Sequence, residues 1–359
     1  MSDSFPKLDG LVCPVPLPHN QTIVLGHGSG GRMSYDLISK IFLPPLDNPV
    51  LRTGDDAGVM NIPGDDGAVS ARLAVSTDSH VVMPLFFPGG DIGRLSVCGT
   101  VNDVSMLGAT PQFLTAGFIL EEGLEVDILS KVVASMKQAA DEAQIQIIAG
   151  DTKVVQKGKA DGLYINTTGF GIIPSGINIS GSAAQPGDKI LVSGTLGDHG
   201  IAVLAARGEL NFDVRISSDV APLNSLVSAM LEATREIHVL RDPTRGGLAT
   251  SLNEIALQSK VGIRIFEDSI PVKPAVSAAC EMLGFDPLYV ANEGKLIAIV
   301  NDKDAEKLLD TMHKHPLGVD AAIIGTVTDS STDYVSLKTT LGTTRMVDML
   351  SGEMLPRIC

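Results

Sequence analysis

The last residue of the chain, Cys359, is the side chain best suited to covalent chemistry, because its thiolate would be a strong nucleophile. It follows Pro356, which cannot continue a helix and favours extended backbone before it. Arg357 offsets the charge of the terminal carboxylate, which would otherwise disfavour the thiolate. We predict a flexible arm over residues 346–359 that carries an acyl-like group on Cys359 into an active site. A chain end without a function is the alternative.

Acidic motifs recur through the first half of the chain and offer hard oxygen ligands. They are Asp55-Asp56 before an expected strand, Asp78 after one, Asn102-Asp103 within an expected helix, and Asp151 after a strand ending at residue 149. A single aspartate at a turn is usually only a cap. Four such sites beside apolar strands favour a pocket that holds Mg²⁺ through one or two carboxylates and the phosphates of a nucleotide.

A glycine-rich loop at residues 26–31 precedes an expected helix over residues 32–43. Its backbone N–H groups could bind phosphate, and His27 is a further candidate for that contact. The glycines satisfy the dinucleotide pattern GxGxxG, but the proline-rich segment 44–49 cannot supply the buried strand that such a site needs next. No Gly-Lys-Ser/Thr sequence is present, which excludes a Walker-type loop.

Composition limits the classes of partner. The net charge is −15, the pI is about 4.8, and tryptophan is absent, so binding to nucleic acid or to an anionic membrane surface is not expected. No apolar run is long enough to span a membrane, and the first residues lack the apolar core of a signal peptide. The four cysteines show no paired spacing, which favours neither disulfides nor zinc. We therefore expect a cytoplasmic protein.

The elements that must position these residues form two series of strands and helices. Strands are predicted at residues 57–62, 73–76, 113–120, 145–149, 163–173, 189–193, 261–266, 296–300, 321–326 and 335–338. Helices are predicted at residues 92–107, 126–143, 199–207, 226–234, 248–259 and 304–313. Because strict βαβ alternation is missing, the pattern predicts an α+β (mixed α/β) fold. We predict an irregular extension at 1–20, domains at 21–175 and 186–345, and the tail.

The motifs in combination resemble one family, the HypE hydrogenase maturation proteins of the PurM-like ATP-binding superfamily. The resemblance covers about residues 21–359, and the terminal cysteine is what narrows it to HypE. The motifs that carry it are His27-Gly28-Ser29-Gly30-Gly31, Gly54-Asp55-Asp56-Ala57, Ser76-Thr77-Asp78, Val101-Asn102-Asp103-Val104, Gly150-Asp151-Thr152-Lys153-Val154, Gly197-Asp198-His199-Gly200, Arg241-Asp242-Pro243-Thr244-Arg245-Gly246-Gly247, Asn292-Glu293-Gly294-Lys295 and Pro356-Arg357-Ile358-Cys359.

The resemblance implies a homodimer of two-domain chains whose N-terminal sheets pair into a β-barrel-like core, with ATP and Mg²⁺ in the cleft beside it. It implies that HypF loads a carbamoyl group onto Cys359, which the enzyme, a carbamoyl dehydratase, dehydrates with ATP to a thiocyanate. The cyano group would then pass to iron on a HypC–HypD complex, as a ligand for [NiFe] hydrogenase.

The resemblance also implies roles for individual residues. Glu293 would be the base and Lys153 would assist it, whereas capping or surface roles are the alternatives for both. The implied metal ligands are Asp55, Asp56, Asp103 and Asp151. The implied nucleotide-binding residues are His27, Gly28, Gly30, Gly31, Asp56, Asp78, Asn102, Asp103, Gly150 and Asp151. Arg241, Asp242, Thr244 and Arg245 would line the cleft, and His199 is left between a phosphate contact and a structural role.

Other classes of function stay open at this point. Another PurM-like ATP-dependent enzyme acting on a small amide or phosphate acceptor would not need the terminal thiol. A selenophosphate synthetase would need a reactive cysteine in an N-terminal glycine-rich loop, whereas Cys13 lies between valine and proline. A nicotinamide-dependent oxidoreductase would have to bind NAD(H) rather than Mg–ATP. A docking scaffold without catalysis would not turn over ATP.

Overall fold

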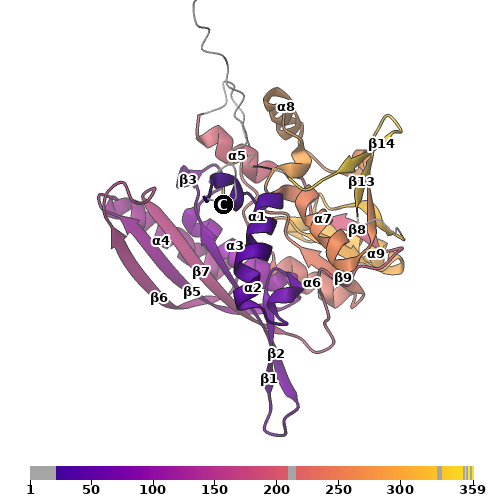
Figure 1. Ribbon diagram of the computed structural model, residues 1–359, viewed down its shortest axis with the longest axis horizontal. Helices are drawn as coiled ribbons and strands as arrows, with labels where there is room; N and C mark the ends of the chain where they lie inside the picture. Colours follow the sequence, from indigo (N-terminus) through magenta and orange to yellow (C-terminus); the bar gives the residue numbers. More distant parts are fainter. Residues whose placement is uncertain (1–21, 209–215, 330–333, 351, 353–354, 356–357) are drawn as a thin grey trace, which may run out of the picture.

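The computed structural model describes residues 22–208, 216–329, 334–350, 352, 355 and 358–359. The extension predicted at residues 1–20 lies outside the described residues, and so does Cys13. The described chain forms two large sheets, each with helices packed against it, and one two-stranded sheet, in agreement with the predicted mixed α/β fold (Figure 1).

The first sheet has the strand order β1-β2-β7-β5-β6 in the described chain. All neighbouring strands are antiparallel except β5 and β6, which are joined by the crossover helix α4. Burial alternates along β7, as expected for a strand with one face on the core. The strands are β1 (Gly58–Pro63), β2 (Val69–His80), β5 (Thr110–Glu121), β6 (Gln146–Val155) and β7 (Leu163–Ile173), and the helices are α3 (Ile92–Met106) and α4 (Val126–Glu142).

The second sheet has the order β14-β13-β10-β12-β8-β11-β9 in the described chain. Its strand β11, between β8 and β9, is buried along its whole length. The strands are β8 (Lys189–Val192), β9 (Ile237–Arg241), β10 (Gly262–Phe266), β11 (Ile297–Val300), β12 (Ala322–Thr328), β13 (Val335–Lys338) and β14 (Thr344–Val347), and the helices are α5 (Asp198–Ala206), α6 (Asn224–Ala233), α7 (Gly247–Ser259), α8 (Pro274–Leu283) and α9 (Ala305–His313).

Helix α3 links the two halves, because it contacts β2 and β7 on one side and α6 and β9 on the other. Asp91 caps its N-terminus by accepting hydrogen bonds from the backbone N–H groups of Gly93 (2.7 Å) and Arg94 (3.2 Å). Thirteen of its fifteen residues are buried, so its side chains are fixed by packing from both halves.

The N-terminal segment lies between the halves as one helical column (Figure 1). It consists of a 3₁₀ turn (Leu25–Gly28), α1 (Arg32–Leu37), a π-helical stretch (Ile38–Phe42) and α2 (Leu43–Leu46). The helix predicted over residues 32–43 is therefore present. The apolar residues 22–25 before the glycine loop form no strand, and Leu25 already begins the 3₁₀ turn.

Two acidic motifs lie inside strands and not at strand ends as predicted. Asp78 is in β2, which continues to His80, and Asp151 is in β6, which continues to Val155. Both strands carry polar residues on an exposed face. The predicted strand ends followed the apolar run, which stops before the strand itself ends. The strand β9, the helix α8, the strand β14 and the short hairpin β3 (Phe86–Phe87) and β4 (Gly90–Asp91) were not predicted. The strand β14 ends at Val347, inside the segment assigned to the tail.

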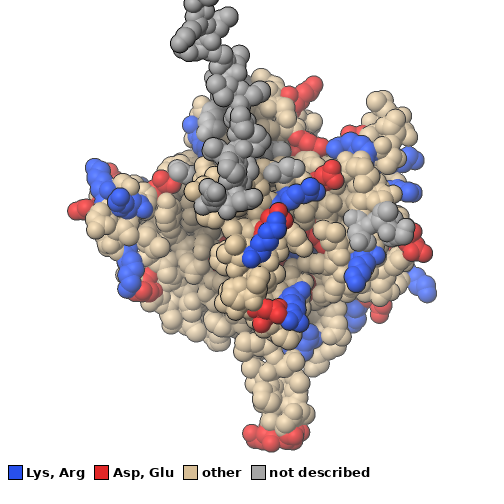
Figure 2. Space-filling view, in the orientation of Figure 1, with Lys and Arg blue, Asp and Glu red and all other residues tan. Residues whose placement is uncertain are grey.

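The space-filling view shows acidic side chains at the tip of the β1–β2 hairpin, where Asp65 and Asp66 are exposed (Figure 2). The described residues include no helix that is long and apolar enough to cross a membrane.

Candidate active site

A cavity of about 320 Å³ lies where the N-terminal glycine loop meets α3 and the start of α7. It brings together residues from four separate sequence motifs, which no local pattern could place side by side. The residues that line it are His27, Gly28, Gly30, Ser34, Ile38, Asp56, Asp103, Arg241, Asp242, Thr244, Arg245, Thr250, Ser251 and Glu254.

Three aspartates of this cavity lie close enough to raise one another's pKa. Burial, followed by repulsion from Asp242 and other acids, raises the pKa of Asp103 well above its usual range. Burial also raises the pKa of Asp56, against the lowering effect of Arg241. Burial raises the pKa of Asp242 to about 7. Because like charges and desolvation both disfavour ionisation here, the cluster would be stabilised by a bound cation.

Arg241, at the end of β9, is a positively charged partner of this aspartate cluster. Its Nη1 lies 3.0 Å from Asp56 Oδ1 and its Nη2 donates to Glu254 Oε2 at 2.8 Å. The side chain is only 6% exposed, so its charge is compensated by buried acids and not by water. Arg241 therefore positions Asp56 and leaves Asp56 Oδ2 without a hydrogen-bond partner.

Glu293 lies in a loop that other buried side chains fasten. Asn102 Nδ2 donates to the Glu293 carbonyl at 3.3 Å and to the Ala221 carbonyl at 3.1 Å, and its Oδ1 accepts from Leu223 N–H at 2.8 Å. The Glu293 N–H donates to Asp219 Oδ1 at 3.1 Å. The Asn102 amide is used in these backbone contacts, so Asn102 holds the loop that carries Glu293. The contact of Asn102 with a nucleotide is not tested by this geometry.

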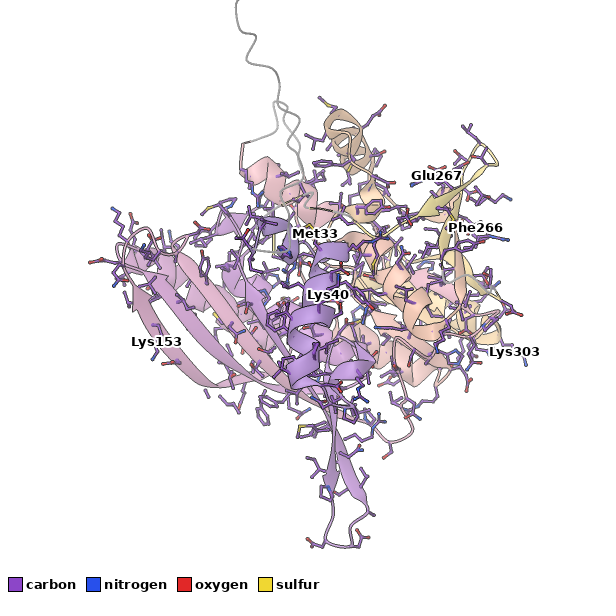
Figure 3. All side chains as sticks on the ribbon, viewed as in Figure 1. Met33, Lys40, Lys153, Phe266, Glu267 and Lys303 are labelled. Carbon is purple, nitrogen blue, oxygen red and sulfur yellow. The ribbon has the colours of Figure 1, made fainter. Side chains whose placement is uncertain are left out.

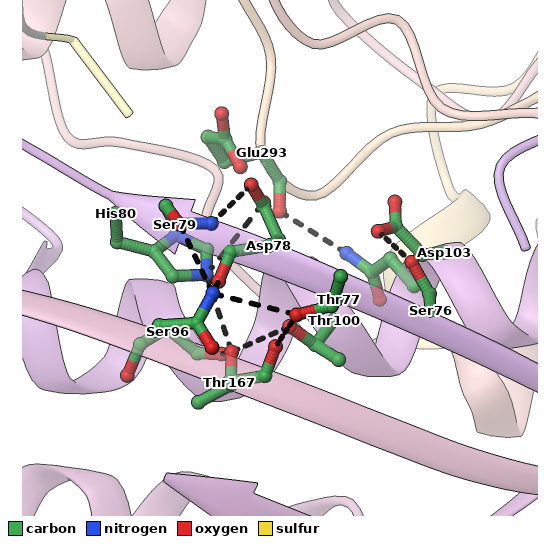
Figure 4. Close-up of polar contacts among 12 residues, drawn as sticks. Ser76, Thr77, Asp78, Ser79, His80, Ser96, Thr100, Asp103, Thr167 and Glu293 are labelled. Atoms are coloured by element: carbon green, nitrogen blue, oxygen red, sulfur yellow. Dashed lines mark hydrogen bonds and ion pairs between the residues drawn. The ribbon is translucent and has the colours of Figure 1, made fainter. Parts of the chain in front are cut away.

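The Glu293 side chain is a buried carboxyl with unused hydrogen-bonding capacity. It is 4% exposed and its Oε1 has no partner in the described structure. Burial, followed by repulsion from Asp242 and Asp78, raises the pKa of Glu293 well above its usual range. Figure 4 shows it beside Asp78 of β2, with Asp103 held by the hydroxyl of Ser76 at 2.7 Å. Such a carboxyl has the proton affinity that a general base needs near neutral pH.

Cys359 docks at this end of the site. Its carbonyl accepts a hydrogen bond from Val81 N–H at 3.2 Å, and the preceding residue forms an antiparallel bridge with Val82. Burial, opposed by Arg245 and reinforced by Glu293, raises the pKa of the Cys359 thiol well above its usual value. The thiol and the candidate base therefore lie near each other in the folded chain.

Arg245 connects the docked thiol with the glycine loop. Its Nη1 donates to the Gly28 carbonyl at 3.1 Å, and its Nη2 lies 4.0 Å from Asp78 Oδ1. Gly30 has a φ of +76°, and a Cβ there would lie 2.8 Å from the Arg245 backbone oxygen, so only glycine fits. His27 Nδ1 accepts from Val24 N–H at 3.0 Å, which gives it a local structural contact on the cavity wall.

Gly31 fits against the tail. Its Cβ would lie 2.1 Å from the carbonyl oxygen of Leu350, which accepts a hydrogen bond from Arg32 N–H at 2.8 Å. The glycine loop thus packs on the tail on one side and on Arg245 on the other. These contacts account for its glycines without phosphate, so phosphate binding by the loop stays a prediction.

The residues on β6 lie apart from this cluster within one chain. Lys153 and Asp151 are exposed and pair with each other at 3.2 Å, and Figure 3 shows Lys153 on the side of the molecule away from the second sheet. Gly150 shares the same exposed strand. Asp55 points elsewhere as well, because its carboxylate accepts from Ser180 Oγ (3.0 Å) and from Gly181 N–H (2.7 Å). A single chain therefore does not unite the four implied metal ligands.

The donor set fits Mg²⁺ bound together with a substrate, although the described residues contain no group of three acids or histidines arranged to hold a metal alone. Mg²⁺ commonly uses one or two carboxylates and completes its shell with water and phosphate. Asp56 and Asp242 each have a buried oxygen without a partner, as such ligands would before a cation binds.

Some residues of the site were missed at the sequence level. Glu254, in α7, pairs with Arg241, and Ser76 was named only as part of a motif although it fixes Asp103. Glu254 has Thr250, Ser251 and Gln258 as neighbours at helical spacing, and a polar helix face of this kind usually faces solvent, so the sequence carried no signal for it. His199, whose role was left open, is not among the residues that line this cavity but contacts the tail at the Ile358 carbonyl.

The comparisons with known proteins agree with this arrangement. The models of AIR synthase related proteins match the chain at residues 54–173 (N-terminal domain) and 185–338 (C-terminal domain). The carbamoyl dehydratase HypE of Cupriavidus necator is 54% identical over 337 residues, which cover 94% of this chain and 95% of that protein.

Two solved structures are similar over most of their length. A crystal structure of a HypE–HypF complex matches with a TM-score of 0.82 and 51% identity, covering 88% of this chain and 99% of the other. A crystal structure of HypE in complex with ATP matches with a TM-score of 0.78 and 51% identity, covering 94% and 100%. On the identity and coverage of these matches, the chain belongs to the HypE family of carbamoyl dehydratases, within the AIR synthase related proteins.

Proposed function

We propose that this protein dehydrates an S-carbamoyl group on Cys359 to an S-cyano group at the expense of ATP. The observation that carries the proposal is the docked end of the chain, which places the buried thiol of Cys359 near the charges of Glu293 and Arg245, beside the cluster of Asp56, Asp103 and Asp242. Related proteins are named for this activity, and one was crystallised with ATP. The cyano group would become a ligand of the iron in [NiFe] hydrogenase.

Loading of the thiol belongs to a different position of the tail. A thiol whose pKa is raised by burial is protonated and a poor nucleophile, so the docked Cys359 is poorly suited to attack a carbamoyl donor. We propose that HypF loads the thiol while the tail is withdrawn, since a relative was crystallised with HypF. The loaded tail then docks. Because the thiocarbamate is tethered to the protein, it reaches the site without diffusing through solution. Flexibility of the tail remains a prediction.

Dehydration then removes the carbamoyl oxygen and two protons. The carbamoyl oxygen attacks the γ-phosphorus of ATP, ADP leaves, and the oxygen becomes part of a phosphate ester. Glu293 accepts a proton from the nitrogen, the C–O bond breaks, phosphate leaves, and loss of the second N–H proton completes the C≡N bond. No redox partner is needed, because ATP supplies only the leaving group. Arg245 stands beside the sulfur and opposes the negative charge that develops.

We propose that Asp56, Asp103 and Asp242 hold Mg²⁺ with the nucleotide, because their mutual repulsion is relieved by a cation. Bound Mg²⁺ would neutralise charge on the phosphates. We also propose a HypC–HypD complex as the acceptor of the cyano group and the cytoplasm as the compartment, since thiols stay reduced there.

The function is tested by intact-mass spectrometry of the full chain. After incubation with HypF, carbamoyl phosphate and ATP, the peptide that ends in Cys359 should gain the mass of a carbamoyl group. Added Mg–ATP should then remove the mass of one water. Cys359→Ala should show neither change, and chelation of Mg²⁺ should stop the second. A wild-type chain that is loaded but never loses water would disprove the proposed function.

We also propose a homodimer in which β6 pairs with a second copy. Its exposed residues include Ile147 (38% exposed), Ile148 (57%) and Val154 (69%), and neighbouring β5 exposes Phe113 and Ile119. A long apolar edge strand is an aggregation hazard unless another chain covers it. Pairing at β6 would also bring Gly150, Asp151 and Lys153 of one chain toward the site of the other, which accounts for their separation here.

The dimer predicts the effect of charges on β6. The double variant Ile148→Asp, Val154→Asp should be monomeric by size-exclusion chromatography with light scattering, because two carboxylates would have to be buried in the interface. Dehydration should fall with dimerisation if β6 completes the site. Leu341→Asp is the matched control, since Leu341 is 90% exposed on the β13–β14 loop. An unchanged mass for the β6 variant would contradict the pairing.

A further inference from the structure

The residue before the thiol is held by backbone contacts that do not depend on the chemistry of Cys359. Ile358 forms an antiparallel bridge with Val82, two residues beyond the end of β2, and Val81 N–H donates to the Cys359 carbonyl at 3.2 Å. The tail thus pairs with the continuation of the strand that carries Asp78. This pairing sets the direction in which the last residue points.

A histidine in the first turn of α5 fixes the same residue. His199 Nε2 lies 2.6 Å from the Ile358 carbonyl oxygen, and its Nδ1 lies 2.8 Å from Ser218 Oγ. A carbonyl can only accept, so Nε2 must carry the proton and Nδ1 must accept from the serine hydroxyl. The tautomer follows from the partners on both sides. Burial lowers the pKa of His199, which keeps the ring neutral in this arrangement.

Apolar packing completes the contact. The Ile358 side chain is 3% exposed and belongs to one buried cluster with Val82, Phe87 and Ala291. The Phe87 ring meets the His199 ring edge to face, with centroids 5.4 Å apart. The hydrogen-bonding ring is itself fully buried, so water cannot compete for the Ile358 carbonyl.

We propose that His199, oriented by Ser218, is a positioning residue that clamps the Ile358 carbonyl and so holds the loaded Cys359 at Glu293. One residue spans about 3.5 Å, so fixing residue 358 confines the sulfur to the space around the Glu293 carboxyl. His199 touches no reacting atom and acts only through the tail. This inference rests on the proposed function for its catalytic consequence, but the clamp itself is measurable without ATP or HypF.

The first experiment measures how often the thiol leaves its docked position. Full-length wild type and His199→Phe are treated with iodoacetamide, and alkylation of each cysteine peptide is followed by mass spectrometry. Phenylalanine keeps an aromatic ring against Phe87 but cannot donate to the carbonyl. Loss of one buried hydrogen bond should raise the alkylation rate at Cys359 about three- to tenfold. His313→Phe is the matched control, because His313 Nε2 bonds the Ala321 carbonyl at 2.8 Å far from the tail.

The second experiment separates positioning from a general loss of structure. In His199→Phe, carbamoylation of Cys359 by HypF should be as fast as in wild type or faster, because loading uses the withdrawn tail, whereas loss of water should slow because the loaded thiol is held less well at Glu293. Ser218→Ala removes the partner of Nδ1 and the acceptor of the Val220 N–H at 3.1 Å but keeps the imidazole at the Ile358 carbonyl, so it should give a smaller change of the same sign. If the His199→Phe protein does not fold, the Ser218→Ala protein still tests the clamp.

Equal alkylation of Cys359 in wild type, His199→Phe and Ser218→Ala would overturn the clamp, whatever the activity of the protein. Wild type that is loaded but does not lose water would overturn the proposed function and leave the alkylation result intact. The two failures are therefore distinguishable in one set of samples.

Discussion

Glu293→Gln is expected to accept a carbamoyl group on Cys359 at the normal rate and then fail to lose water. Glutamine keeps the size of the buried side chain but cannot accept the proton from the carbamoyl nitrogen. Removing a positioned general base typically costs about 10²- to 10⁴-fold in rate. Loading should be spared, because we place it in the withdrawn state of the tail. The two steps are read separately as a gain of carbamoyl mass and a loss of water.

The pH dependence of the second step gives an independent check on the same residue. A base must be ionised, and burial raises the pKa of Glu293. As the pH is lowered, the rate should therefore begin to fall at a pH above the range in which an ordinary glutamate titrates. Arg245 lowers this pKa, so Arg245→Met should move the fall to still higher pH.

Glu267→Gln is the matched control for the glutamate variant. Glu267 accepts from Thr340 N–H at 2.7 Å on the surface. It should dehydrate as wild type does. A Glu293→Gln protein that loses water at the wild-type rate would remove Glu293 from the role of base.

Periodic patterns made most of the fold predictable. The helices α3 and α4 and the strand β7 lie within about one residue of the segments predicted, because all three are long and α4 and β7 each have one apolar face. The strand β9 was missed because its five residues include His238 and Arg241. Both polar residues are satisfied by distant acids, Asp188 and Asp56, that no local pattern reveals.

The candidate site was predictable as a set of residues but not as an arrangement. Residue types and the family resemblance pointed to Cys359 and Glu293, and the structure brings the two together. Neither the residue types nor the resemblance revealed that the Asn102 amide hydrogen-bonds to the backbone around Glu293, or that the Asp55 carboxylate accepts from the Gly181 N–H. Such contacts join residues more than a hundred positions apart, so they exist only once the two halves have packed.

Arg241→Met is expected to lower the free energy of unfolding by about 3–5 kcal/mol, the usual cost of removing one partner from a buried ion pair. The guanidinium lies between Asp56 and Glu254 and also donates to the Gly54 carbonyl at 3.1 Å. Methionine fills much of the space but leaves the acids without a counter-charge. Denaturant unfolding of the full chain measures the loss. Arg345→Met is the control, since Arg345 pairs with Asp286 at the surface and should cost below about 1 kcal/mol.

The loss in Arg241→Met should depend on pH in a defined direction. Arg241 lowers the pKa of Asp56, so its removal raises the folded-state pKa of that carboxyl further above the unfolded value. A carboxyl with a raised folded-state pKa binds its proton more readily when folded, so it destabilises the fold as pH rises between the two pKa values. The deficit relative to wild type should therefore be smaller at acidic than at alkaline pH. A deficit that is constant with pH would mean that Arg241 stabilises the fold by packing rather than by its charge.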